Sequence, residues 1–437
     1  MLKTEKSTKK ERIAWYFYDW ANSAFATTVI AVFLGPYLTN VAQQSAINGY
    51  LNILGIKIFA DSFYHYCIFI SVVLQIVFLP IIGAIADYTR YKKTLFGVFA
   101  YIGALSTMGL YFVQGGNFFL GGFLFIIANL CFGTSIVLYN SYLNDLSDNE
   151  GRDQVSSFGW AFGYLGGGLL LIVNTIFLLI YKNSIGMENA VRISICSAGV
   201  WWAIFTIIPM FGLKKREPIY KIDKQSKIVI TSIKNLFQNL KNIKKYPKTL
   251  LFIIAYFFYN DGVQVVFYSS AQFGSEELGI GMDILIQVIL LVQFVAFIGT
   301  FLFNKLAEII GTKKSLLLSL VIWTGAVFYA YLFLRGQLDF FILGAVIGLV
   351  LGGTQALSRS IYSQIIPRGK EAEYFSIYEL SDKGTSALGP LVFALTLQLT
   401  NSYRHAILII SLFFILGFFL LMKFDFKKAK EDVLLKI

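Results

Sequence analysis

Long apolar runs, separated by short polar segments, follow one another along the whole chain. About twelve of these runs reach the ~20 residues that an α-helix needs to cross a bilayer. The pattern therefore predicts an all-α integral membrane protein with twelve transmembrane helices. The expected spans are residues 13–41, 63–86, 94–113, 118–142, 157–181, 190–213, 248–271, 283–306, 314–334, 338–361, 375–400 and 404–423.

The composition agrees with this class. Of the 437 residues, 57% are hydrophobic and 14% are charged, whereas soluble domains average about 25% charged residues. A formal net charge of +12 in a soluble protein would suggest nucleic-acid binding. Here the basic residues lie in short segments between spans, so we expect no nucleic-acid partner.

Lysine and arginine are concentrated in every other segment between spans. They occur before residue 13, in the turns at 86–94 and 306–314, after residue 213 and in the C-terminal tail. The intervening loops Gln114–Asn117 and Gln272–Gly281 contain none. Because basic loops are retained on the cytoplasmic side, we expect both termini and the central segment to be cytoplasmic.

The basic central segment divides the chain into two halves of six spans. We expect residues 1–213 to form an N-terminal six-helix bundle and residues 248–437 a C-terminal six-helix bundle with a short tail. Residues 214–247 form the predicted linker. Within it, apolar residues recur at helical spacing over Ile228–Leu240, opposite a lysine-rich face. This pattern favours an amphipathic helix on the inner membrane surface.

Similar motifs occur in the same order in both halves. Gly83–Lys93 follows the second span, and Asn304–Lys314 follows the eighth, with an acidic residue and a closing Lys-Lys pair at equal spacing. A Gly-Thr pair and a later tyrosine recur in Gly133–Tyr142 and Gly353–Tyr362. Such a repeat favours two pseudo-symmetric bundles with a site between them near mid-membrane.

The repeated motif predicts a gate on the cytoplasmic side. Gly83 allows a neighbouring helix to approach closely, and Asp87 can meet either a helix N-terminus or Arg90. Glu308 holds the matching place in the second half. The alternative is that these residues only anchor the loop by its positive charge.

A polar patch lies inside the first span. Asp19 is costly in hydrocarbon, by roughly 2.5–3.5 kcal/mol on insertion scales. Asn22 and Ser23 follow at i+3 and i+4, so they share its helix face. With Tyr18, these residues are candidates for the lining of a transport path. The alternative is a buried polar cluster that locks the first helix to its neighbours.

The seventh span contains a matching group at Asn260, Asp261 and Gln264. The repeat would place it across the cavity from Asp19. The alternative is a helix-start cap, because asparagine and aspartate favour that position.

Arg359 lies inside the tenth span and requires an acidic partner. Glu379 and Asp382 of the eleventh span are the candidates, and Lys383 can pair with Glu379 along its own helix. A buried pair often costs as much stability as it returns. We therefore interpret the group as a gate that breaks during a transport cycle, with a permanent structural pair as the alternative.

No enzyme signature accompanies these residues. The chain has only two histidines, neither with metal-ligand spacing, and no Walker motif. We therefore expect no enzymatic activity, no metal and no cofactor, and no direct use of ATP.

Three blocks of sequence resemble a known family. Tyr18–Phe25 resembles the first-helix signature of the fungal vacuolar amino-acid effluxers, a branch of the major facilitator superfamily. Gly352–Ser360 and Ile366–Phe375, continuing to Leu388–Pro390, are similar to the same family, and Gly83–Lys93 resembles the superfamily's loop signature. The resemblance implies the major facilitator fold and transport of a small solute, with amino-acid export as the known example.

We therefore expect a secondary transporter in a bacterial inner (plasma) membrane that works by alternating access. Its expected substrate is a small polar solute, an amino acid or a related metabolite, moved outward. Asp19 is the candidate carrier of a coupling proton. We expect a monomer whose other partners are membrane lipids. A lipid or lysolipid flippase of the same fold and a transporter-like sensor are the alternatives.

Overall fold

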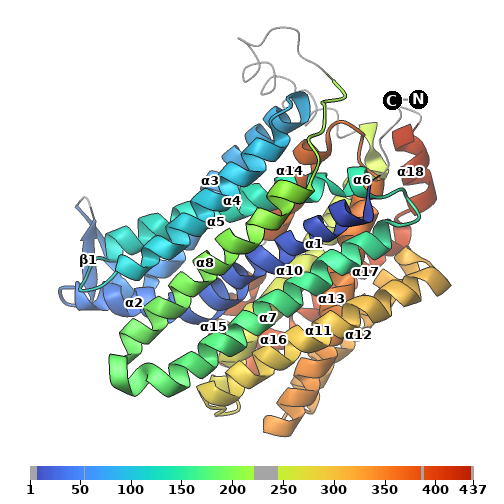
Figure 1. Ribbon diagram of the computed structural model, residues 1–437. Helices are drawn as coiled ribbons and strands as arrows, with labels where there is room; N and C mark the ends of the chain where they lie inside the picture. Colours follow the sequence, from blue (N-terminus) through green and yellow to red (C-terminus); the bar gives the residue numbers. More distant parts are fainter. Residues whose placement is uncertain (1–6, 54, 221–244, 385–387, 435–437) are drawn as a thin grey trace.

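The computed structural model describes residues 7–53, 55–220, 245–384 and 388–434, and at residues 268, 271, 272, 282, 283, 382–384, 390 and 434 it describes the backbone only. Helices dominate this part of the chain (Figure 1). By length and apolar composition, eleven helical stretches of the described residues can cross a membrane.

The first half contains six of these stretches. The first stretch joins three elements, α1 (Lys9–Ala24), the π-helical η1 (Phe25–Phe33) and α2 (Leu34–Gln44). The others are α3 (Phe63–Tyr88), α4 (Lys92–Gly109), α5 (Phe118–Ser141) with the short α6 (Leu143–Leu146), α7 (Arg152–Ile185) and α8 (Met187–Gly212).

The π-helical segment has a local cause in the sequence. Pro36 lies in the first turn of α2. Proline has no N–H to donate and its ring clashes with the carbonyl four residues earlier. The backbone before Pro36 therefore adopts the wider π-helical turns instead of ending.

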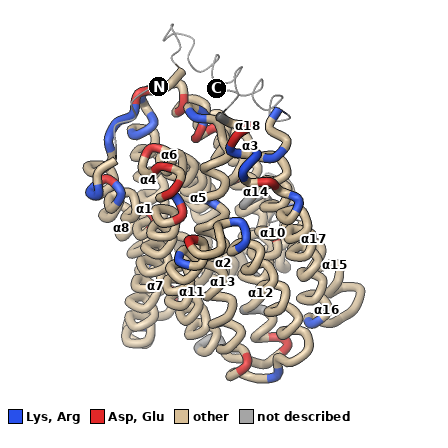
Figure 2. The backbone as a smooth tube through the Cα atoms, turned by 90° about the vertical axis from the view of Figure 1, so that its right-hand side faces the viewer, with Lys and Arg blue, Asp and Glu red and all other residues tan. Residues whose placement is uncertain are grey.

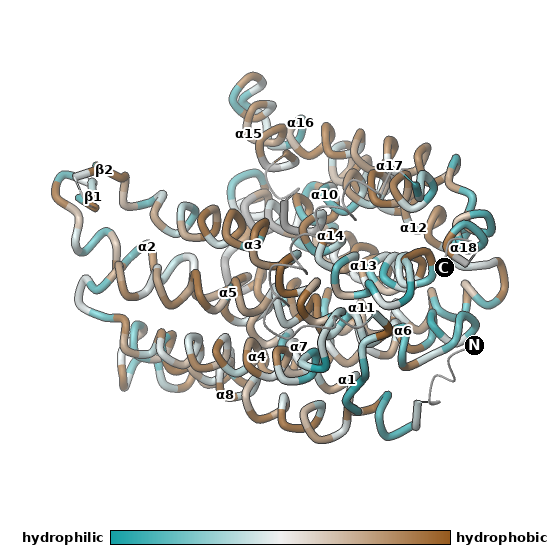
Figure 3. The backbone as a smooth tube through the Cα atoms, turned by 90° about the horizontal axis from the view of Figure 1, so that it is seen from above, coloured by the Kyte–Doolittle hydropathy of each residue, from teal (hydrophilic) through white to brown (hydrophobic). Residues whose placement is uncertain are grey.

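A small hairpin connects α2 to α3. Strands β1 (Tyr50–Ile53) and β2 (Ile56–Phe59) pair antiparallel, with Tyr50 opposite Phe59. It projects at one side of the molecule (Figure 3), in a loop for which the sequence predicted no element.

The second half contains the other five stretches. They are α10 (Pro247–Glu276), α11 (Met282–Ile310), α12 (Thr312–Leu332), α13 (Gln337–Gln364), and α16 (Tyr403–Leu408) with α17 (Ser411–Lys423). The amphipathic α18 (Phe426–Leu434) follows.

The expected span 375–400 is described in two parts, on either side of residues 385–387. It is occupied by α14 (Glu371–Gly384) and α15 (Leu388–Thr400), and its apolar helical part is only Leu391–Thr400. The first of these helices is rich in acidic residues, and Gly389-Pro390 disfavours a continuous helix at this place. The described residues therefore support eleven candidate spans where the sequence predicted twelve.

The two halves meet along two seams. On one seam α7 packs against α11 and α13, and on the other α14 packs against α3 and α5. Figure 2 shows charged residues gathered at the end of the bundle where the chain begins and ends, which we call the termini-bearing end.

The start of the central segment is fixed to the first half at this end. Glu11 accepts hydrogen bonds from the Lys214 amide (3.1 Å) and from Arg216 (2.8 Å). The amphipathic helix predicted at Ile228–Leu240 lies outside the described residues.

Candidate functional site: a central cavity and the contacts that close one end

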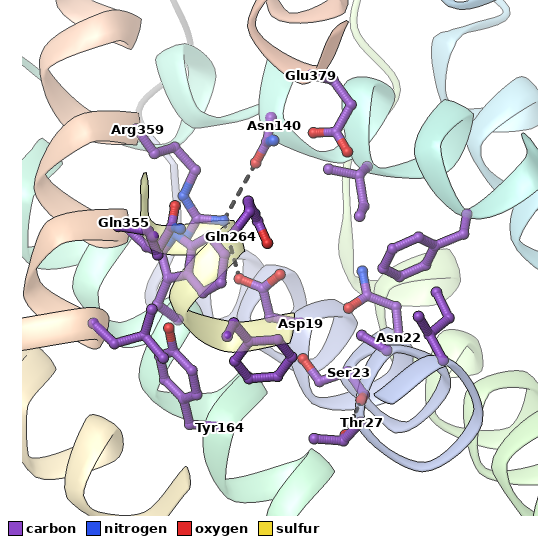
Figure 4. Close-up of a pocket in the computed structure, with 18 of the residues that line it drawn as sticks. Asp19, Asn22, Ser23, Thr27, Asn140, Tyr164, Gln264, Gln355, Arg359 and Glu379 are labelled. Carbon is purple, nitrogen blue, oxygen red and sulfur yellow. Dashed lines mark hydrogen bonds and ion pairs between the residues drawn. The ribbon is translucent and has the colours of Figure 1, made fainter. Parts of the chain in front are cut away.

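A cavity of about 240 Å³ lies between the two halves (Figure 4). Helices α1, α5 and α7 line it from the first half, and α10, α11, α13 and α14 line it from the second. Its polar lining residues are Asp19, Asn22, Ser23, Thr27, Asn140, Gln264, Gln293, Gln355, Arg359 and Glu379.

A buried ion pair joins the halves at the wall of this cavity. Arg359 Nη1 lies 3.1 Å from Asp19 Oδ2, and the two side chains come from α13 and α1. The Tyr139 hydroxyl donates a second hydrogen bond to the same carboxylate oxygen, at 2.7 Å. The charge on Asp19 is therefore balanced by a cation and a neutral donor.

The guanidinium of Arg359 is held by further contacts from the first half. It donates from Nε to Ser156 Oγ at 3.0 Å and from Nη2 to the Ser156 carbonyl at 2.7 Å. Its carbon lies 5.0 Å from the Trp15 ring and 5.2 Å from the Trp160 ring, within cation–π range. Only 2% of the Arg359 side chain is exposed. Its charge-assisted hydrogen bonds therefore depend on the exact placement of these partners.

Glycines on α7 make the close approach of α1 possible. A Cβ at Gly159 would lie 2.7 Å from Arg359 Nη2 and 2.8 Å from Asp19 Oδ2. A Cβ at Gly166 would lie 2.6 Å from the Trp20 carbonyl oxygen. Small residues at helix contacts of membrane proteins allow this backbone proximity.

Four of the seven residues proposed from the sequence as cavity residues line the cavity: Asp19, Asn22, Ser23 and Gln264. The other three do not. Tyr18 packs on Phe96, with ring centroids 4.4 Å apart, inside the first half. Asn260 lies behind Gln355, from which it accepts a hydrogen bond at 3.1 Å. Asp261 is fully buried outside the cavity lining.

The prediction that Glu379 is the ion-pair partner of Arg359 was wrong. Its ion pair in the structure is with Asp19, not with Glu379. The guanidinium points across the interface because Ser156 and the Trp15 ring surround it there. Glu379 lines the same cavity from α14. The side chains of Asp382 and Lys383 lie outside the described residues.

At the termini-bearing end, Asp87 closes the seam between α3 and α14. Its two oxygens accept the backbone N–H groups of Ala372 (3.0 Å) and Glu373 (2.8 Å), in the first turn of α14. Of the two partners considered for Asp87, the structure has the helix N-terminus, while Arg90 is exposed. A Cβ at Gly83 would lie 2.6 Å from the Ala372 carbonyl oxygen.

A second carboxylate lies at the same helix N-terminus. Glu371 is buried, and this burial raises the pKa of its carboxyl, while the charge of Lys92 opposes the shift. Glu371 Oε2 accepts the Gly369 N–H at 2.9 Å. The first turn of α14 thus concentrates acidic groups where the helix dipole favours them.

Glu308, the repeat counterpart of Asp87, makes no matching contact. It is exposed and accepts a hydrogen bond from Asn304 of its own helix at 3.1 Å. The inter-half contacts on this seam come instead from Asp153 of α7, which accepts from the hydroxyls of Thr312 (2.5 Å) and Ser360. The contact between the halves that was expected from Glu308 is made by Asp153 of the first half.

Several residues at the site were missed from the sequence. Tyr139, Gln355 and Tyr378 gave no signal, because aromatic residues make up 17% of the chain and a single glutamine in a span commonly joins helices. Ser156 and Asp153 lie at the polar start of α7, where their position did signal a helix N-terminus. Asn140, Gln293, Trp160 and Tyr164 also line the cavity.

In the part of the chain that the structure describes, no group of three or more histidine, cysteine, aspartate or glutamate side chains is arranged to hold a metal ion. The polar groups that line the cavity, Asp19, Arg359 and their neighbours, offer ionic pairing and hydrogen bonding.

This arrangement of helices is that of the major facilitator superfamily. The crystal structure of the proton:xylose symporter XylE, bound to 6-bromo-6-deoxy-D-glucose, matches with a TM-score of 0.70 over 95% of both chains. At 14% sequence identity, this likeness concerns the fold. The protein is thus an integral, multi-pass membrane protein of the major facilitator class.

Within this class, the chain belongs to the family described as "Vacuole effluxer Atg22 like", which it matches over residues 7–152 and 144–434. It is 32% identical to the "Uncharacterized MFS-type transporter YxiO" of Bacillus subtilis, over 95% of each chain. It is 27% identical to "Autophagy-related protein 22" of Vanderwaltozyma polyspora, over 99% of this chain and 94% of the relative. The family resemblance noted in the sequence is confirmed.

Proposed function

We propose that this transporter exports an amino acid or a related small zwitterion, and that the Asp19–Arg359 pair is its binding site. The observation that carries the proposal is this ion pair, which spans the two halves at 3.1 Å on the wall of the central cavity. The family description "Vacuole effluxer Atg22 like" supports transport of a solute across a membrane, and the outward direction is part of our proposal.

A zwitterion matches the pair chemically. Its carboxylate can replace Asp19 at the Arg359 guanidinium, and its ammonium can replace Arg359 at the Asp19 carboxylate. Both protein charges then keep a partner, which avoids the large penalty of an unpaired buried charge. A cavity of about 240 Å³, below the ~300–1,000 Å³ of most ligand pockets, favours a small solute.

Unused donors in the cavity support a substrate carboxylate. Asn22 Nδ2 and Trp160 Nε1 are buried, and neither has a hydrogen-bond partner among the described residues. Both residues line the cavity. Because buried donors without partners are unfavourable, these two atoms are suited to a bound anionic group or to ordered water.

Alternating access follows from where the halves touch. In our proposal the termini-bearing end is cytoplasmic, as the basic loops favour, and α14 with α15 forms a twelfth crossing. The contacts of Asp87 and Asp153 then close the cytoplasmic side. A substrate that separates Arg359 from Asp19 weakens the hold between the halves and permits rocking about the central site.

The remaining parts of the proposal concern coupling, location and assembly. Proton coupling through Asp19, as we propose it, requires the ion pair with Arg359 to open. We place the protein in a bacterial plasma membrane, as the Bacillus relative supports, working as a monomer among membrane lipids.

A lipid or lysolipid flippase is the second candidate. A neighbouring apolar pocket of about 130 Å³ shares Ile30 and Phe267 with the central cavity and is lined mainly by aliphatic side chains of α11 and α13. An acyl chain could occupy it while a headgroup meets the ion pair.

The test is a thermal-shift measurement on purified protein with free amino acids, N-acetyl amino-acid amides and lysolipids. We expect stabilisation by free amino acids that is lost in Asp19→Asn and kept in Asp61→Asn, an exposed acid remote from the cavity. Equal stabilisation by the uncharged amides would contradict the zwitterion site. Stabilisation by lysolipids alone would favour the flippase.

A further inference from the structure

A second carboxylate in the membrane region is placed very differently from Asp19. Asp261 of α10 is 0% exposed, and neither of its oxygens accepts a hydrogen bond from a described side chain. We propose that Asp261 is a proton-binding site, separate from the Asp19–Arg359 pair, and that it takes up and releases the coupling proton of the transport cycle. This inference rests on the proposed transport function.

The backbone amide of Gly389 and apolar side chains surround Asp261. A Cβ on Gly389, in the first turn of α15, would lie 3.0 Å from Asp261 Oδ1. The next residue, Gly262, faces the Phe414 ring of α17 at 3.0 Å from where its Cβ would be. A carboxylate enclosed in this way is far more stable as the neutral acid than as the anion.

Charged groups on the packed helices do not offset this enclosure. The second-half helix α15 carries no charged residue, and α17 carries only Lys423, at its C-terminal end. On α13 the nearby cation is Arg359, which is paired with Asp19. On α14 the described acid Glu379 lines the cavity, whose lining does not include Asp261.

Asp19 and Asp261 differ in the partners that surround their carboxyl groups. Asp19 has a guanidinium and a tyrosine hydroxyl as hydrogen-bond partners. Asp261 has neither, so it favours the protonated form in this conformation. A proton needs only one carboxylate oxygen, whereas a metal cation needs several oxygen ligands.

Protonation of Asp261 can be linked to the cavity through its neighbour. Asn260 precedes it on α10 and accepts a hydrogen bond from Gln355, which lines the cavity. A conformation in which α15 separates from α10 would admit water to Asp261 and favour proton release. By linkage, the proton then stabilises the conformation seen here, in which the two helices are in contact.

The first experiment needs no substrate. Infrared difference spectra of the purified protein report the carbonyl stretch of protonated carboxyl groups as the pH is varied. We expect a band that persists at neutral pH in the wild type, in Asp19→Asn and in Asp61→Asn, and that is missing in Asp261→Asn. If Asp261→Asn keeps every protonated-carboxyl band of the wild type, the proposal is wrong.

The second experiment uses liposomes and L-leucine as the probe. We expect Asp261→Asn to keep leucine counterflow and to lose most of the acceleration by a pH gradient, roughly tenfold in a coupled transporter. Full pH-driven transport in Asp261→Asn would overturn the proposal. The proposal would also be overturned if a sodium gradient accelerated leucine transport in the wild type and this acceleration were lost only in Asp261→Asn. Size-exclusion elution checks that the variant is folded.

The two proposals fail separately. If the wild type shows neither leucine counterflow nor stabilisation by amino acids, the proposed function fails for this class of solute, while the infrared band still decides the protonation of Asp261.

Discussion

Two seams hold the halves together at the termini-bearing end, and they use the same kind of contact in different ways. On the α3–α14 seam, Asp87 accepts two backbone N–H groups from the N-terminus of α14. On the α7 seam, the repeat counterpart Glu308 is exposed, and Asp153 contacts the hydroxyls of Thr312 and Ser360 instead. A repeated sequence motif therefore does not guarantee a repeated contact.

The physical reason lies in what surrounds each acid. Gly83, one turn before Asp87, lets the α14 backbone approach α3. The matching position in the second half is Asn304, whose side chain occupies that space and donates to Glu308. The hydrogen bond that Glu308 accepts among the described residues is this one within α11, whereas Asp87 accepts two from the facing helix.

The largest effect is expected from Asp87→Ala. The change removes two hydrogen bonds to a charged group, about 1.5–3 kcal/mol each, and leaves amides of α14 buried without partners. We expect leucine transport in liposomes to fall by roughly tenfold or more. Transport at the wild-type rate would show that this seam is not a gate.

An intermediate effect is expected from Asp153→Ala. Contacts between Ser156 and the Ala356 carbonyl (2.7 Å) and between Arg152 and the Ser363 carbonyl (3.1 Å) remain on the same seam. We therefore expect a destabilisation of about 1–3 kcal/mol, measured as a lower melting temperature, with a smaller loss of transport. A loss larger than that of Asp87→Ala would reverse our ranking of the seams.

The smallest effect is expected from Glu308→Gln. The side chain is exposed and, in the described part of the chain, it accepts a hydrogen bond from Asn304 of its own helix, so the stability should change by no more than about 0.5 kcal/mol. Asn304→Gly, with Glu308 left in place, tests whether the missing glycine is the cause. A transport defect in Glu308→Gln alone would show that Glu308 acts in another conformation of the cycle.

The sequence predicted the class of fold because apolar runs of membrane length leave few alternatives. It also placed Asp19 and Arg359 inside spans, since ionisable residues there stand out. It could not pair them, because the pairing depends on how α13 and α1 cross between the halves. Tyr139 and Ser156 could not be singled out, because tyrosine and serine are both common in this sequence.

The central claim is that a zwitterion at the Asp19–Arg359 pair releases the contacts that close one end of the transporter. The most direct measurement is the distance between spin labels at Arg90→Cys and Arg368→Cys, both exposed positions, after replacement of Cys67, Cys131 and Cys196. Saturating L-leucine should shift the distance distribution to longer values, and Asp19→Asn should abolish the shift. An unchanged distribution with leucine, or an equal shift in Asp19→Asn, would contradict the account.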